Sequence, residues 1–268
     1  MRTPWGEGNA DTMPIRFAEQ RVLFFLAELQ AVFLLSFKAL RGIFSRPFYY
    51  REFVSQLDKI GVESLFIVCL TGLFTGMVMA LQALIQLKPF AATGYVGGMV
   101  AVTMVKELGP VLASLMVAGR VGSAITAELG SMVVTEQVDA MRVEGTDIVK
   151  RLVTSRLKAM LIAMPLLTVV ADTIALLGGY LIASGYHISP LMYWKSLPQF
   201  MRFQDLVEGV AKPAFFGLLI VMIACRVGLS VSGGAEGVGV SVKRTVVVSS
   251  VFILVSDFFI TKIFIAFR

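Results

Sequence analysis

Histidine and cysteine are almost absent from this chain of 268 residues, which has one histidine, His187, and two cysteines. A single histidine excludes a histidine-rich metal site, and we expect no bound metal. The cysteines, Cys69 and Cys225, both lie within apolar runs, which makes a disulfide framework improbable. The chain also lacks the GxxxxGKS/T loop that binds nucleotide phosphates, and no Ser-His-Asp or Cys-His constellation is apparent. We therefore do not expect an enzyme, and any ATP hydrolysis must come from another chain.

Charged residues are also scarce: they make up 16% of the chain, against 57% hydrophobic residues. The mean hydropathy is +0.81, far from the balance of a soluble domain, and indicates an integral membrane protein. The net charge of +6 could suggest a nucleic-acid partner. The basic residues, however, flank apolar runs instead of clustering, so they indicate membrane topology and no nucleic acid.

Five apolar runs are long enough to cross a membrane as helices, which requires about 20 residues. We expect spans at about residues 63–86, 95–119, 159–183, 211–231 and 245–267. The predicted fold class is an all-α integral membrane protein with an N-terminal interfacial helix, five transmembrane helices and a cytoplasmic coupling helix.

The first part of the chain differs from these runs. We expect a mobile tail over 1–20, an interfacial or membrane-associated helical region over 21–62, and the transmembrane domain over 63–268. The run 22–37 is interrupted by Glu28 and Gln30 and is short for a span, which favours a helix in or dipping into the interface. A signal peptide is the alternative, although no small-residue cleavage site follows.

The basic residues outside the spans predict the orientation. Seventeen lie on the side of the N-terminus and of residues 120–158, and six on the other side, Lys212 among them. The positive-inside rule then puts the N-terminus in the cytoplasm. On the same side, the glycine-rich stretch 233–239 is interpreted as a flexible connection.

Gly72 and Gly76 have the GxxxG spacing that lets two helix backbones approach closely. Packing inside the subunit and packing across a dimer both remain open. Met77 and Met79 follow and suit an irregular apolar ligand, but methionines of this kind are usually core residues.

Charges inside the predicted spans are the strongest functional signal, since a charge at bilayer depth costs at least a few kcal/mol. Lys106 and Glu107 stand together in the second span, and Pro110 is expected to bend the helix and open space beside Glu107. Glu107 is either a satisfied structural contact or a cavity-lining group that meets a polar headgroup. Asp172 and Asp257 also lie mid-span and either pair across the bundle or form a proton relay.

The region 120–158 breaks the apolar pattern without becoming a loose loop. Residues 124–141 are rich in helix formers, with Glu128, Glu136 and Asp139 among the polar positions. This pattern predicts a short amphipathic helix that lies on a cytoplasmic partner, with an ordinary solvated linker as the alternative. The apolar positions of this helix are Met132, Val133, Val138 and Met141.

Several blocks of the sequence resemble the signature of the MlaE/YrbE permeases. They are Glu107–Pro110 (ELGP), Ala118–Arg120 (AGR), Gly122–Ala124 (GSA), Ala127–Gly130 (AELG), Thr135–Gln137 (TEQ), Pro165–Val169 (PLLTV), Arg244–Val247 (RTVV) and Asp257–Phe258. The blocks keep their spacing from about residue 55 to the C-terminus, which is much more specific than one short motif.

The resemblance implies a lipid-transport ABC permease of the bacterial inner membrane. Two copies would pair with two cytoplasmic ATPase subunits, which bind ATP and Mg, so this chain would carry no cofactor. A ring of MCE-domain proteins on the periplasmic side and, in some systems, a STAS-domain protein would complete the assembly.

The resemblance also implies roles for individual residues. Residues expected to bind phospholipid are Met79, Leu87, Phe90, Lys106, Glu107 and Leu108. Residues expected to couple to the ATPase are Glu128, Glu136, Gln137, Asp139, Met141 and Glu144. Residues expected to pack helices are Gly72, Gly76, Gly109 and Pro110.

Two positions depart from the family pattern. The position before Glu107 is often arginine in the family and is Lys106 here, and lysine holds phosphate as a point charge instead of bidentately. Phe90 supplies no hydroxyl where some relatives have tyrosine. Both departures bear on headgroup selectivity.

Two functions of other classes remain as alternatives. One is a proton-coupled secondary transporter that uses Glu107, Asp172 and Asp257; the absence of a visible inverted repeat counts against it. The other is a structural membrane anchor of an envelope complex.

Overall fold

The computed structural model describes residues 30–43 and 49–266, and within these residues the chain is helical without any strand. Five helical runs are long and apolar enough to cross a membrane: Tyr50–Phe90, Thr93–Val134, Val149–Gly185, Phe203–Leu229 and Gly234–Ala266. The predicted all-α integral membrane protein with five transmembrane helices is therefore confirmed. The predicted tail 1–20 lies outside the described residues, and the proposed domain boundaries stay predictions.

Short π-helical or 3₁₀ turns interrupt most of the runs. The first consists of α2 (Tyr50–Leu57), η2 (Asp58–Val62), α3 (Glu63–Leu87) and η3 (Lys88–Phe90). The second consists of η4 (Thr93–Tyr95), α4 (Val96–Thr103), η5 (Met104–Leu108), α5 (Gly109–Val117), η6 (Ala118–Gly122) and α6 (Ser123–Val134). After α7 (Gln137–Val143) come η7 (Val149–Thr154), α8 (Ser155–Gly185), α9 (Pro190–Phe200), α10 (Phe203–Leu229) and α11 (Gly234–Ala266).

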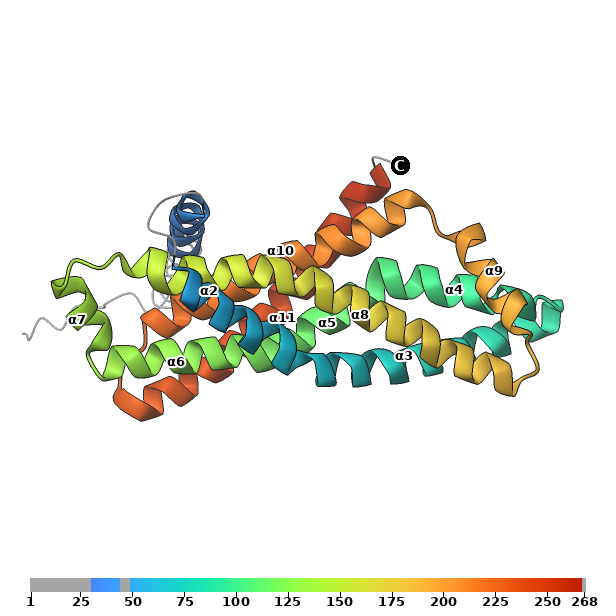
Figure 1. Ribbon diagram of the computed structural model, residues 1–268, viewed down its shortest axis with the longest axis horizontal. Coiled ribbons are helices and arrows are strands. Elements are labelled where there is room, and N and C mark those ends of the chain that lie inside the picture. The colour runs from blue at the N-terminus through green and yellow to red at the C-terminus, as the bar shows by residue number, and fades with distance from the viewer. Residues whose placement is uncertain (1–29, 44–48, 267–268) are drawn as a thin grey trace, which may run out of the picture.

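The long helices run along one axis, with α7 at one end of the bundle and α9 at the other (Figure 1). At the α9 end, the hydroxyl of Tyr193 donates to the carbonyl oxygen of Leu176 in α8 at 3.0 Å, and burial raises the pKa of Tyr193. The backbone N–H of Gly98 donates to Oγ of Ser196 at 2.9 Å. These bonds hold α9 on α8 and α4.

Residues 30–42 form a helix that does not follow the long axis of the bundle (blue in Figure 1). Ala39 is buried, and its carbonyl oxygen accepts a bond from Oγ1 of Thr154 at 3.4 Å. Phe33 and Phe37 are exposed, as expected of a helix that lies in a membrane interface. The first residues of the predicted run 22–37 lie outside the described part of the chain.

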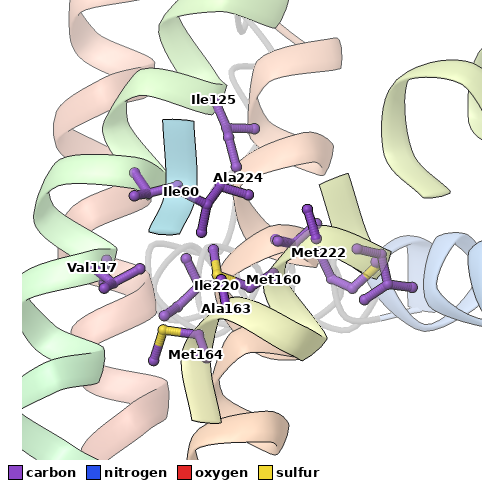
Figure 2. Packing of buried hydrophobic residues seen from close by; sticks show 14 of the residues in the cluster. Ile60, Val117, Ile125, Met160, Ala163, Met164, Ile220, Met222 and Ala224 are labelled. Atoms are coloured by element: carbon purple, nitrogen blue, oxygen red, sulfur yellow. The ribbon is translucent and has the colours of Figure 1, made fainter. Parts of the chain in front are cut away.

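The larger core joins helices that are far apart in the sequence. Figure 2 shows Ile60 of η2, Val117 of α5, Met160 of α8 and Ile220 of α10 converging. These side chains are at most 1% exposed, so the core holds α8 against its neighbours on several sides.

Gly72 and Gly76 lie on the face of α3 that packs against α8. A Cβ added at Gly72 would lie 2.6 Å from the carbonyl oxygen of Ala171, and one at Gly76 would collide with that of Ala175. The GxxxG pair therefore packs two helix backbones inside the subunit.

The predicted amphipathic helix over 124–141 is two helices, because α6 continues the second membrane run to Val134 and a turn at Glu136 (φ 58°) precedes α7. The predicted boundaries were wrong because α6 packs against α10 and α11. Thr126 Oγ1 lies 2.8 Å from Thr245 Oγ1, and Leu129 is fully buried. The glycine-rich stretch 233–239 is not a flexible connection either, because α11 already begins at Gly234.

We expect Gly76→Ala to lower the denaturation temperature of the purified chain, because the added methyl group meets the backbone of α8. Overpacking of this kind typically costs about 1–3 kcal/mol. Gly239→Ala is the matched control, since no atom lies within 4 Å of a Cβ added there. Equal denaturation temperatures for the two variants would contradict the close approach of α3 and α8.

Candidate functional site

An irregular stretch of the second membrane run carries the first charged residues of the site. The π-helix η5 contains Lys106 and Glu107, and α5 follows with Pro110 in its first turn. In an α-helix, the carbonyl of residue 106 would accept from the N–H of residue 110, but proline has none. The Lys106 carbonyl instead accepts a bond from Nζ of Lys212 at 2.9 Å. Pro110 thus leaves a backbone acceptor open to a side chain of α10.

Lys212 joins three segments of the chain through a fully buried ammonium group. Its Nζ lies 2.8 Å from Oε2 of Glu107, 3.1 Å from Oδ1 of Asp257 and 3.2 Å from Oε1 of Glu208. It also donates to Oγ1 of Thr261 at 2.8 Å. These contacts hold η5, α10 and α11 together inside the bundle.

Lys106 forms a second group of ion pairs with α10. Its Nζ lies 3.3 Å from Oδ1 of Asp205 and 3.9 Å from Oε2 of Glu208. Glu208 therefore lies between the two lysines, with one carboxylate oxygen toward each. Asp205 also accepts the backbone N–H of Arg202 at 2.9 Å, which fixes its carboxylate at the start of α10.

The two lysines face four acids: Glu107, Asp205, Glu208 and Asp257. Each lysine ammonium is paired with at least two carboxylates, as a buried cation requires. Glu107 keeps 38% of its side chain exposed, whereas Asp205 and Glu208 keep 3% and 7%. Within the described residues, no group of three His, Cys, Asp or Glu side chains is arranged to hold a metal ion.

A hollow of about 260 Å³ lies beside this cluster. Lys106, Asp205 and Glu208 line it, together with apolar side chains such as Phe203 and Phe264. Charged groups of both signs beside apolar walls suit an amphipathic molecule with a polar headgroup.

The predicted lipid-binding residues fall into three places. Lys106 and Glu107 belong to the charged cluster through different partners. Met79, Leu87 and Leu108 are half-buried and pack around the smaller core of α3, α4, α8 and α9. Phe90 is 80% exposed in η3.

Asp257 meets Glu107 through Lys212, whereas no described hydrogen bond or ion pair links Asp172 to them. Asp172 is 7% exposed, and its Oδ1 has no hydrogen-bond partner among the described residues. It lies against Gly109, where an added Cβ would collide with the carboxylate. Gly109 therefore leaves room for a buried carboxyl group between α5 and α8.

The predicted coupling residues lie near the C-terminal end of the second run and in or beside α7, which follows it. Glu136, Gln137, Asp139 and Glu144 are exposed in or beside α7, and Met141 is half-buried. Buried Val138 anchors this short helix to the bundle. Glu128 belongs to α6, where its carboxylate pairs with Arg156 at 2.8 Å and Lys59 at 3.6 Å.

Sequence reasoning missed Lys212, Asp205 and Glu208 as site residues. It counted Lys212 with the basic residues outside the spans, although Lys212 stood at the edge of the expected span 211–231; α10 begins at Phe203 and buries it inside the bundle. The available signal was the spacing of Glu208 and Lys212, four apart and therefore on one helix face.

Comparisons with known proteins agree with this architecture. The sequence profile of the family described as Permease MlaE matches residues 53–263. A probable ABC transporter permease protein of Rickettsia typhi is 40% identical over 231 residues, which cover 86% of this chain and 89% of the relative. A probable ABC transporter permease protein of Synechocystis is 34% identical over 234 residues, covering 87% and 89%.

A third relative has a more specific name. The intermembrane phospholipid transport system permease protein MlaE of Haemophilus influenzae is 35% identical over 247 residues, which cover 91% of this chain and 94% of the relative. The matched profile covers nearly all of the five membrane runs and every ion pair of the charged cluster described above. The chain therefore belongs to the MlaE family of ABC transporter permeases and is a transporter subunit rather than an enzyme.

Proposed function

We propose that this chain moves phospholipid across or out of the bacterial inner membrane, driven by a separate ATPase subunit. The observation that carries the proposal is the similarity over nearly its whole length to a phospholipid transport permease. The hollow beside Lys106 supports it, because it combines charged side chains of both signs with apolar walls inside a membrane helix bundle.

The substrate headgroup binds at the open side of the charged cluster. Lys106 attracts the phosphate, and Asp205 and Glu208 hold its ammonium in place. Glu107 is the most exposed acid bonded to Lys212, so it is the group that meets an incoming headgroup. Phe264 and the neighbouring apolar residues contact the acyl chains.

Force reaches the cluster through the second membrane run. This run extends from Thr93 to Val134, carries Lys106 and Glu107 in η5, and ends next to α7. When the ATPase closes, it pushes on the exposed polar face of α7. The motion shifts η5 against α10, which narrows the hollow and releases the lipid.

The complete transporter contains two copies of this chain, two ATPase subunits and a periplasmic MCE-domain assembly, with a STAS-domain protein in some systems. The excess of basic residues on the side of α7 supports a cytoplasmic position for that end and for the N-terminus. The MCE-domain assembly then meets the end that carries α9.

Glu107→Gln tests the headgroup site. The amide can still accept a bond from Lys212, so we expect the transporter to assemble while lipid-stimulated ATPase activity falls roughly tenfold, the scale of one charge-assisted hydrogen bond. The assay uses the purified transporter with its partner subunits in phospholipid vesicles.

Glu63→Gln is the control, because Glu63 forms an ion pair with Arg120 at 2.8 Å and has no ion pair with Lys106 or Lys212. A purely structural anchor predicts that Glu107→Gln leaves lipid traffic intact. Intact lipid traffic in a normally assembled Glu107→Gln transporter would show that Glu107 does not bind the headgroup.

The double variant Glu136→Lys/Asp139→Lys tests the coupling surface. Asp139 pairs with Arg142 at 2.8 Å, and both residues are exposed, so we expect the fold to survive. Charge reversal on the face that meets the ATPase should reduce lipid-stimulated ATPase activity several-fold, because like charges across an interface are repulsive.

The charge-matched control is Asp58→Lys/Glu236→Lys, which reverses two exposed acids outside α7. Normal lipid-stimulated activity in the α7 variant would show that the ATPase does not dock on this face. Equal losses in both double variants would indicate a general effect of net charge.

A further inference from the structure

A second charged hollow lies at the α7 end of the bundle, apart from the cluster around Lys212. It measures about 430 Å³ and lies between α2, α6, α7 and the start of the third membrane run. Its walls carry the cations Arg51, Lys59, Arg151 and Arg156 and the acids Glu52 and Glu128.

The acids do not neutralise these cations. Arg151 pairs with Glu52 at 3.4 Å, and Glu128 is shared by Lys59 and Arg156. Arg51 has no ion pair or hydrogen bond of its side chain within the described residues. The hollow therefore carries a positive excess and attracts an anion.

The buried side chain of Arg156 is the strongest indication that the hollow binds a ligand. It is only 3% exposed, and its guanidinium bonds the carbonyl oxygen of Leu152 at 2.7 Å and Glu128 at 2.8 Å. Its Nε has no hydrogen-bond partner among the residues that the structure describes. Buried donors are nearly always satisfied, and an arginine fork matches the geometry of a phosphate group.

A neighbouring hollow of about 390 Å³ continues toward the middle of the bundle. The two hollows share Lys59 and Glu128, and the second adds apolar walls from Ile60, Val121 and Ile125. A polar chamber that opens beside an apolar one matches an amphipathic ligand better than a free anion.

The sequence positions of the lining residues indicate how deep the hollow lies in the membrane. Residues 51–59 come just before the apolar run 63–86, and residues 151–156 come just before the run 159–183. Three membrane runs thus bring their polar ends to one level, where lipid headgroups lie. Basic pockets between membrane helices at this level bind anionic headgroups.

We propose that this hollow binds the phosphate headgroup of an anionic phospholipid, with Arg51, Arg151 and Arg156 as its ligands and the start of the acyl chains along Ile60 and Ile125. The site is separate from the hollow at Lys106 and goes beyond the proposed transport. Its occupant contacts α2, α6, α7 and α8 together, so it stabilises the base of α7.

The experiment detects lipid that is bound at this hollow. A photoreactive amino acid replaces Ser55, an uncharged residue of the wall, in the transporter purified with its partner subunits. The protein is reconstituted in vesicles of phosphatidylglycerol and phosphatidylcholine, and the cross-linked lipid is identified by mass spectrometry. We expect phosphatidylglycerol to be enriched above its share in the vesicle.

The test variant is Arg51→Gln/Arg151→Gln, which leaves the buried Arg156–Glu128 pair intact. Its phosphatidylglycerol cross-linking should fall about thirtyfold, since each basic residue near the surface contributes about fivefold. The charge-matched control, Lys38→Gln/Lys243→Gln, removes two exposed lysines outside the hollow and should keep the enrichment.

Other outcomes would overturn the proposal. Equal losses in both double variants would mean general surface attraction, and no loss in either would remove the arginines as ligands. If excess inorganic phosphate abolished the cross-link to phosphatidylglycerol, the ligand would be a soluble phosphate. If the test variant kept the lipid but lost its ATPase subunit, the hollow would hold an acidic protein segment.

Discussion

The buried ammonium group of Lys212 is the interaction on which the rest of the membrane domain depends. It binds Glu107 of η5, Glu208 of α10 and Asp257 of α11, so three membrane runs share one cation. Leaving a buried charge without a partner typically costs about 3–5 kcal/mol, so the buried ammonium of Lys212 depends on these carboxylates. The same contacts position Glu107 at the edge of the cluster.

The π-helix and the proline beside it explain why this cation binds where it does. Pro110 cannot donate to the carbonyl of Lys106, and that carbonyl accepts from Lys212 instead. Beyond η5, the same helical run continues to Val134, close to α7, so one element links the cluster to the surface proposed to couple to the ATPase. In the proposed mechanism, a displacement of α7 is transmitted along this run to Lys106.

Much of the fold could be predicted because the length of an apolar run is a local property of the sequence. Five runs of membrane length correspond to the five membrane helices. The ends of α6 and α10 could not be predicted, since tertiary contacts determine where these helices begin and end. Glu128 and Lys212 interrupt the hydropathy pattern, yet Arg156 and Glu107 pair with them in the bundle. Lys106 and Glu107 stood out as charges at depth, but their partners on α10 depend on helix packing.

The central claim is that this chain moves phospholipid with energy from ATP, and one measurement tests it most directly. The transporter, purified with its partner subunits, is reconstituted in vesicles with labelled phospholipid, and lipid movement is followed with ATP or with a non-hydrolysable analogue. The account predicts movement that requires hydrolysis and continues when the proton gradient is collapsed. Movement that follows the proton gradient and needs no ATP would contradict it.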